Sequence, residues 1–149
     1  MAIQYKIEET TDWYPLSELF HTCGMEVAVS KTAPEGIVKM WRMVDAANGK
    51  LLAAATLEKR DTVYTLGDIG VRPDLQKQGF GRILQNVVFD AARAMGIPEL
   101  WGSAKVPKYY YQFGWEKKDW NTSPRVAEKC HTCNRRGKDC FPEILRIKL

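Results

Sequence analysis

Residues 66–82 read LGDIGVRPDLQKQGFGR, which we interpret as a strand that ends in a tight turn and opens directly into a helix. The apolar residues before the turn change parity at Gly67 and Asp68, as they do where a β-bulge adds one residue and splays a strand. Pro73 then blocks continuation of the strand ladder. From 80 to 95 the apolar residues follow the spacing of an amphipathic helix, which Gly96 ends.

The turn at 76–82 is predicted to hold an anion. Gly79 and Gly81 place no side chain between a ligand and the backbone N–H groups that a helix start leaves without partners. Lys77 and Arg82 lie at the end of the helix where the dipole disfavours cations, and a bound anion would resolve this conflict. A turn that needs glycine only for its geometry is the alternative, because lone glycine patterns are weak signals.

The longer run VRPDLQKQGFG, residues 71–81, resembles the acyl-CoA-binding signature of the GNAT N-acyltransferase superfamily, V-x-P-x-x-Q/R-x-x-G-x-G/A. In that family the loop binds the pyrophosphate of coenzyme A through backbone amides. Two competing phosphate-binding motifs fail on spacing, because no G-x-x-x-x-G-K-[ST] run exists and Leu84 stands where a dinucleotide fingerprint has its third glycine. The resemblance implies a site for acetyl-CoA formed by Ile69, Gly70, Val71, Gln76, Lys77, Gln78, Gly79, Phe80, Gly81, Arg82 and Ser103.

A second match lies at 106–115, where VPKYYYQFGW is similar to the GNAT segment A-x-x-x-Y-x-x-x-G-F/W. By that spacing Tyr110 takes the place of the tyrosine that the family often keeps near the coenzyme sulfur, which implies a proton donor to the leaving thiolate. Without the resemblance, three adjacent tyrosines on a short helix would mostly pack or reach water. Ser103 and Val106 depart from the family, which commonly has asparagine and alanine at those positions.

The bulge suggests further catalytic groups. Splaying the strand would free backbone groups near Ile69 and Val71, which the family uses to pair with pantetheine and to orient the thioester. For the general base the sequence offers Asp68, beside the bulge, and Glu26, in an early segment that often shapes the acceptor pocket. Either carboxylate could act through water or serve only the structure. Asp68 enters the candidate catalytic set with Tyr110.

The resemblance implies the GNAT fold, an α+β fold in α/β/α layers. Its central sheet is mixed, mostly antiparallel, splayed between the fourth and fifth strands and flanked by helices. Asn48-Gly49 predicts a type I′ hairpin turn, and strand, helix and strand around 80–95 predict a parallel, right-handed βαβ unit. The remaining predicted elements are strands at 3–8, 37–45, 51–57, 99–103 and 144–149, a helix near 13–20, an uncertain helical or irregular piece at 21–34, and a charged turn at 58–61.

A cysteine-containing loop at 130–140 departs from the common pattern. Cys130-x-x-Cys133 followed by a glycine turn is half of a zinc knuckle, and Cys140 adds a third thiol. Distant Cys23 would complete a closed, structural zinc site with four cysteine ligands. Ordinary reduced thiols are the alternative. A redox pair is less favoured, because a catalytic Cys-x-x-Cys should open a helix, whereas the residues after Cys133 read as a turn.

The composition predicts one soluble globular domain over residues 1–149, with 45% hydrophobic and 27% charged residues. The net charge of +4 suits an anionic ligand but is too small to argue for nucleic acid. No apolar run approaches the roughly 20 residues that cross a bilayer, and residues 1–12 lack the apolar segment of a secretory signal. We therefore expect a cytoplasmic monomer or homodimer without nucleic-acid or membrane partners.

The resemblance implies an acyl-CoA-dependent N-acyltransferase. It would move an acetyl (acyl) group from acetyl-CoA to a primary amine of a small molecule or peptide, by direct attack in a ternary complex. One alternative is a non-catalytic acyl-CoA sensor, which would keep the loop but turn over no amine. Another is a metal-stabilised module that presents the basic tail to nucleic acid, through Lys129, Arg135, Arg136 and Lys138.

Overall fold

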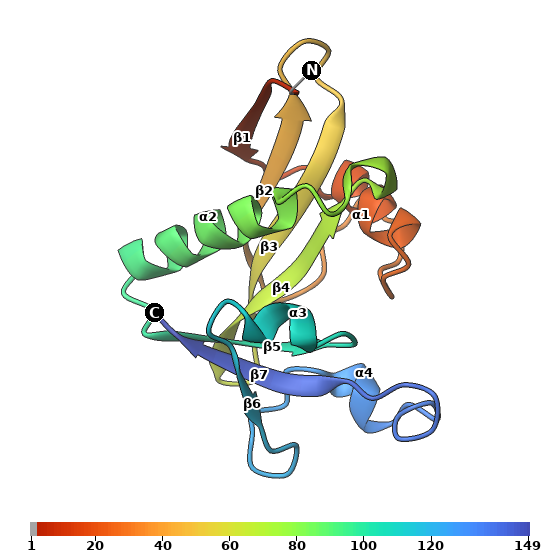
Figure 1. Cartoon of the computed structure of the whole chain (residues 1–149), viewed down its shortest axis with the longest axis vertical. Coiled ribbons are helices and arrows are strands. Elements are labelled where there is room, and N and C mark those ends of the chain that lie inside the picture. Colours follow the sequence, from red (N-terminus) through yellow and green to blue (C-terminus); the bar gives the residue numbers. More distant parts are fainter. Residues whose placement is uncertain (1–2) are drawn as a thin grey trace.

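The computed structural model describes residues 3–149 as a seven-stranded sheet with helices packed against it (Figure 1). The strands are β1 (Tyr5–Glu9), β2 (Ile37–Asp45), β3 (Leu51–Arg60), β4 (Val63–Val71), β5 (Glu99–Ala104), β6 (Glu116–Lys118) and β7 (Glu143–Lys148). The helices are α1 (Trp13–Thr22), the short 3-10 helix η1 (Pro73–Leu75), α2 (Phe80–Ala94), α3 (Lys108–Tyr111) and α4 (Glu128–His131).

The strands lie in the order β1-β2-β3-β4-β5-β7-β6, and every neighbouring pair is antiparallel except β4 and β5. These two parallel strands share a single register pair, Thr65 with Trp101. Beyond that pair they diverge, and Figure 1 shows β5 and β7 running across the direction of β2, β3 and β4. The predicted mixed sheet, splayed between its fourth and fifth strands, is confirmed.

Helices α1 and α2 cover opposite faces of the sheet. Ala53 packs in the core cluster that contains Leu84 and Val88 of α2, whereas its neighbour Ala54 packs in the cluster that contains Leu16 of α1. Successive residues of a strand point to opposite faces, so the two helices form the outer layers of the predicted α/β/α arrangement.

The bulge in β4 occurs at the predicted place. Ala55 pairs with Ile69 and Leu57 pairs with Leu66, so two residues of β4 face the single Thr56 of β3. The hydroxyl of Thr56 accepts a hydrogen bond from the backbone N–H of Asp68, at 2.8 Å. This contact satisfies the amide that the bulge removes from the strand ladder.

Helix α2 begins and ends close to the predicted residues. Gly79 precedes it in the left-handed region, at φ +89°, and Gly96 follows it at φ +77°. The N–H of Gly96 donates to the carbonyl of Arg93, and the N–H of Ile97 donates to that of Ala92. The helix therefore ends with a glycine directly after its C-cap residue, the position where glycine is most common.

The predicted charged turn at 58–61 is wrong, because β3 continues to Arg60. The chain reverses instead at Asp61, which has a φ of +54°. Glu58 is buried at 3% exposure. Its Oε1 accepts a hydrogen bond from Nη2 of Arg60 at 2.9 Å, and its Oε2 accepts one from the hydroxyl of Thr56 at 2.8 Å. These two contacts let a charged residue occupy a buried strand position.

The structure contradicts one further local prediction and decides between the two alternatives of another. Gly49 has a φ of +73°, but Asn48 does not share a positive φ as a type I′ turn requires. The N–H of Gly49 donates to the carbonyl of Asp45, so the hairpin closes through a longer loop. Residues 23–34 contain no helix, which selects the irregular reading of that segment.

Candidate active site

The divergence of β4 and β5 leaves one edge of β4 open. Arg72 donates its backbone N–H to the carbonyl of Leu52 on β3, at 2.8 Å. Because backbone groups along a strand alternate between its two edges, the amides of Ile69 and Val71 face away from β3. These amides point toward the edge of β4 where β5 no longer pairs with it. These two predicted residues therefore offer strand hydrogen bonds to a ligand in the gap.

The carbonyl of Val71 lies at the end of this open edge and is already hydrogen-bonded within the protein. It accepts a hydrogen bond from Nε2 of Gln76 at 3.1 Å and another from the Cys23 thiol at 3.2 Å. Gln76 thus fixes the course of the loop that follows β4. At Gly70 a Cβ atom would lie 3.0 Å from the ring of Phe20, so this glycine admits the end of α1 against the strand.

The loop at 76–82 forms a cradle of backbone amides. Lys77 has a φ of +66° and Gly79 a φ of +89°, and residues 76–79 are exposed. Ile83 makes the first bond of α2, to the carbonyl of Gly79. The amides of residues 80–82 therefore have no partner within the helix. This combination of free amides and a helix N-terminus suits a phosphate, as predicted from the glycine spacing.

The side chains of the cradle have different environments. Phe80 is buried against Tyr5, with ring centroids 5.8 Å apart, so only its backbone is available to a ligand. The guanidinium of Arg82 lies 4.9 Å from the ring centroid of Phe113. A Cβ atom at Gly81 would lie 3.3 Å from the hydroxyl of Tyr109. The cradle therefore packs closely against the segment that carries Tyr110.

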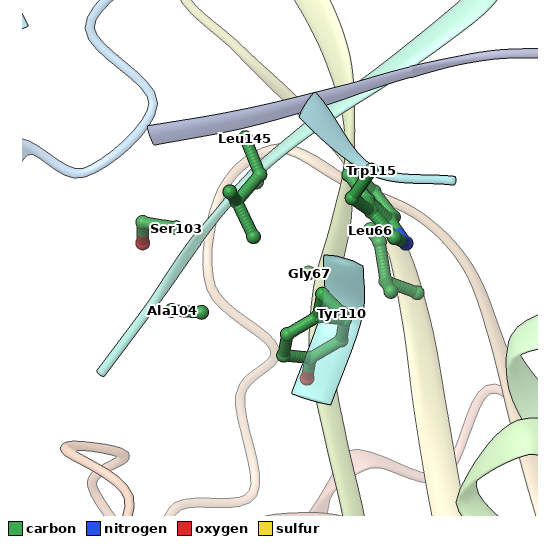
Figure 2. A pocket seen from close by; sticks show the side chains of 8 residues that line it. Leu66, Gly67, Ser103, Ala104, Tyr110, Trp115 and Leu145 are labelled. Carbon is green, nitrogen blue, oxygen red and sulfur yellow. The ribbon is translucent and has the colours of Figure 1, made fainter. Parts of the chain in front are cut away.

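A pocket opens at the splay, and Figure 2 shows its lining. Tyr110 reaches into it from α3, with Ser103 and Ala104 of β5 across from its ring. The rings of Tyr110 and Trp115 meet edge to face, with centroids 6.0 Å apart. The full lining is Leu66, Gly67, Gly102, Ser103, Ala104, Tyr110, Trp115 and Leu145. Predicted residues from two sequence segments, Ser103 and Tyr110, thus share one pocket at the open edge of β4.

Burial raises the pKa of Tyr110 to about 12, with a smaller contribution from Tyr109. The phenol therefore stays protonated throughout the neutral range. A protonated hydroxyl at the splay can donate a hydrogen bond to a group that becomes negative during a reaction, such as a departing thiolate.

Asp68 is half-buried next to Gly67 and has a raised pKa of about 6. The chief cause is burial, and the second is the negative charge of Glu58. Arg60 and Lys129 oppose the rise. A carboxylate with such a pKa is deprotonated at neutral pH, yet it is a stronger base than an exposed aspartate.

Sequence reasoning missed the buried network behind Asp68. Glu58, Thr56 and Arg60 alternate along β3 and hydrogen-bond to one another. A Cβ atom at Gly67 would overlap both the Glu58 carboxylate and the Thr56 hydroxyl. The alternation of polar residues at 56, 58 and 60 indicates a strand with one polar side. The charged run at 58–61 favoured a turn instead, so this strand signal was not used.

The second candidate base, Glu26, lies in a different pocket. Glu26 is exposed, and its backbone carbonyl accepts a hydrogen bond from Nζ of Lys129 at 3.2 Å. The same pocket is lined by Lys105 and by residues of the cysteine-containing loop. The structure therefore brings Glu26 to the tail of the chain, whereas Asp68 lies beside the pocket of Tyr110.

The predicted four-cysteine zinc site is not assembled in residues 3–149. Cys130, Cys133 and Cys140 line one pocket, but the thiol of Cys23 donates to the carbonyl of Val71 at the end of β4. No three His, Cys, Asp or Glu side chains in the described part of the chain are arranged to hold a metal ion. All four thiols are free of disulfides. Burial raises the pKa of both Cys23 and Cys130.

The described helices are short. The longest, α2, has 15 residues, and none between residues 3 and 149 is long and apolar enough to cross a membrane.

Solved structures share this fold. N-acetylglutamate synthase from Neisseria gonorrhoeae, complexed with coenzyme A and N-acetyl-glutamate, matches with a TM-score of 0.74 and 17% identity. The match covers 100% of this chain but 36% of that chain, so this chain spans about a third of its length. The ribosomal-protein-S18-alanine N-acetyltransferase from Escherichia coli matches with a TM-score of 0.70 and 21% identity, over 97% of this chain and 94% of that chain.

A GNAT family acetyltransferase from Elizabethkingia anophelis, with acetyl-CoA bound, matches with a TM-score of 0.67 and 17% identity. This match covers 97% of this chain and 98% of that chain. No curated protein matches the sequence. The family model described as acetyltransferase (GNAT) family matches residues 7–115, which include the bulged strand, the amide cradle and Tyr110. The chain therefore belongs to the GNAT acetyltransferase family.

Proposed function

We propose that the protein transfers an acetyl group from acetyl-CoA to a primary amine of a small molecule or peptide, by direct attack in a ternary complex. The observation that carries this proposal is the position of Tyr110. Its side chain lines the pocket at the splay, which Leu66 and Gly67 of β4 also line, and its phenol is protonated. A thioester held along the open edge of β4 would present its sulfur and carbonyl to this pocket.

The residues present suit acetyl-CoA as the donor. The amides of residues 80–82, with those of the loop before them, would hold the pyrophosphate. Lys77, Gln78 and Arg82 would contribute at the rim of this cradle, since the first two are exposed and Arg82 lies over Phe113. The amides of Ile69 and Val71 would pair with the pantetheine as a neighbouring strand does. Ser103 would contact the cofactor from the opposite wall.

In the proposed reaction one side chain accepts a proton and another donates one. The amine nitrogen attacks the thioester carbonyl, so that a C–N bond forms and the C–S bond breaks. Asp68, directly or through a water, accepts the proton that the attacking nitrogen loses. Tyr110 donates its hydroxyl proton toward the departing sulfur. A backbone N–H on the open edge of β4 would stabilise the negative charge that develops on the carbonyl oxygen.

The first test concerns the donor site. Replacing Gly79 or Gly81 with valine should abolish acetyl-CoA binding measured by calorimetry. Valine at 79 cannot adopt the left-handed backbone easily, and valine at 81 would press on Tyr109. Gly96→Val is the matched control for position 79, because Gly96 also has a positive φ in open space but lies at the other end of α2. Unchanged affinity in both the Gly79 and the Gly81 variants would refute the assignment.

The second test concerns the transfer itself. Labelled acetyl-CoA is incubated with amines and peptides, and the label is followed into the acetylated product. We expect incorporation that depends on protein and saturates with amine. Binding of acetyl-CoA without transfer to any amine would favour the sensor alternative over the enzyme.

A further inference from the structure

The pocket that contains Glu26 has an unusual charge. Four cations line it, namely Lys105, Lys129, Arg135 and Arg136, and Glu26 is the one carboxylate in its lining. The pocket therefore carries a net positive charge.

These cations are mostly without acidic partners. Within residues 3–149 only Arg135 of the four forms an ion pair, with Asp139 at 3.2 Å. Lys129 donates to a neutral backbone carbonyl, that of Glu26. The guanidinium of Arg136 lies over the Trp120 ring, 3.9 Å from its centroid. Aromatic stacking holds this guanidinium in place without neutralising it.

This basic pocket adjoins the proposed reaction centre. Ser103 and Ala104 line the pocket of Tyr110, and the next residue, Lys105, lines the basic pocket. Asp68 lies beside Gly67 of the first pocket, and the charge of Lys129 in the second is close enough to act on it. The proposed base is therefore next in sequence to a residue of one pocket and within electrostatic reach of a cation of the other.

The basic pocket is also distinct from the amide cradle. Lys129, Arg135 and Arg136 belong to α4 and the loop after it, which Figure 1 shows beyond the splay, away from the loop that opens α2. The donor's phosphates have their own site at 76–82. A second anion site is therefore available to the acceptor.

We propose that this pocket binds the acceptor, and that the acceptor is a small amine that also carries an anionic group, a carboxylate or a phosphate. Lys105, Lys129 and Arg136 would hold the anion and direct the amine toward Asp68. This inference rests on the proposed acetyl transfer. It adds the class of acceptor, which no motif in the sequence indicates.

The test compares pairs of amines that differ in the anion. β-Alanine is compared with its amide, and phosphoethanolamine with ethanolamine, so that the two pairs distinguish a carboxylate from a phosphate. Calorimetry on the protein loaded with coenzyme A gives affinities, and labelled acetyl-CoA gives kcat and KM. We expect at least one anionic amine to bind about tenfold or more tightly than the partner that lacks the anion. In the transfer assay this preference should appear as a lower KM.

Variants locate the anion. Lys105→Gln should remove most of the preference for the anionic amine, whereas Lys105→Arg should retain that preference. Lys138→Gln is the control, because Lys138 lies in the same loop but does not line the pocket. It should behave as the wild type.

The outcomes separate this inference from the proposed function. Equal affinities within both pairs would overturn it, as would a preference that survives Lys105→Gln or falls equally in Lys138→Gln. If neutral amines are acetylated without any preference for anionic ones, acetyl transfer stands and the substrate class is refuted. If anionic amines bind selectively but receive no acetyl group, the pocket stands and the transferase is refuted.

Discussion

The proposed donor side and the proposed acceptor side of this molecule are built in different ways. On the donor side, 63–94, function resides in the backbone, through a bulge, an open strand edge and a row of amides at a helix start. On the acceptor side, the loop at 130–140 presents charged and thiol side chains from an exposed surface. A site made of backbone requires glycines at fixed spacing and leaves a readable motif. A site made of side chains leaves none.

The largest contrast should come from matched glycine substitutions. Gly67→Ala would drive a Cβ atom into the buried Glu58 carboxylate, and separating Glu58 from its partners should cost about 3–5 kcal/mol in free energy of unfolding. Gly137→Ala in the cysteine-containing loop meets open space and should cost only about 1 kcal/mol for its positive φ. Urea denaturation measures both. Equal losses would mean that the donor side is no more tightly constrained than the loop.

Asp68→Asn should produce the next largest effect, on activity. Loss of a general base typically lowers the rate by about 10²–10⁴-fold. In the wild type, kcat/KM should rise with pH through a pKa of about 6 as Asp68 loses its proton. The variant should lack this acidic limb. A wild-type profile that is flat across this range, or a variant that retains the limb, would assign the base elsewhere.

The same variant should gain stability. The folded-state pKa of Asp68 is raised from 3.8 to about 6, so the folded protein holds the proton more tightly than the unfolded chain. The stability that this proton provides is present below pH 3.8 and is lost as the pH rises through about 6. Above that range ionised Asp68 destabilises the fold, by no more than roughly 3 kcal/mol. Asp68→Asn should therefore be more stable than the wild type at pH 8, and the difference should vanish near pH 4.

The smaller catalytic effect is expected at Tyr110. Tyr110→Phe removes the hydroxyl at the splay and should lower kcat by about tenfold to a hundredfold with little change in KM, because the interaction strengthens as the thiolate departs. Tyr111→Phe is the matched control, since Tyr111 is exposed and does not line the pocket. If both variants kept wild-type kcat, Tyr110 would have only a packing role.

The sequence predicted the parts of the fold that local patterns determine. The bulge at Gly67, the boundaries of α2 and the parallel crossover all follow from spacing within a few dozen residues. Glu58 was misassigned because a run of charged residues indicates a turn, whereas Arg60 and Thr56 stabilise it inside a strand. Pairwise contacts of this kind depend on burial, which a local pattern does not specify.

The proposed acceptor pocket could not be predicted from the sequence for a different reason. Glu26, Lys105 and Lys129 are far apart in the sequence, and they line one pocket only in the folded chain. The cysteines illustrate the same point. Their spacing at 130, 133 and 140 suggested a metal, but the fourth position depends on where α1 ends, and Cys23 lies against Val71 instead.

The smallest effect is expected from metal removal, which tests the four-cysteine zinc hypothesis directly. Cys23 is held at the end of β4 by its bond to Val71, so it could join the other three thiols only by leaving that contact. We therefore expect a strong chelator to leave the Tm unchanged and elemental analysis to find no stoichiometric zinc. Thiol titration should find all four cysteines reactive, with exposed Cys133 first. Burial and a raised pKa should make Cys23 and Cys130 slower, because the thiolate is the reactive form. About one zinc per chain, with a Tm that falls on chelation, would show instead that the cysteine-containing loop is held by a metal and is as constrained as the donor side.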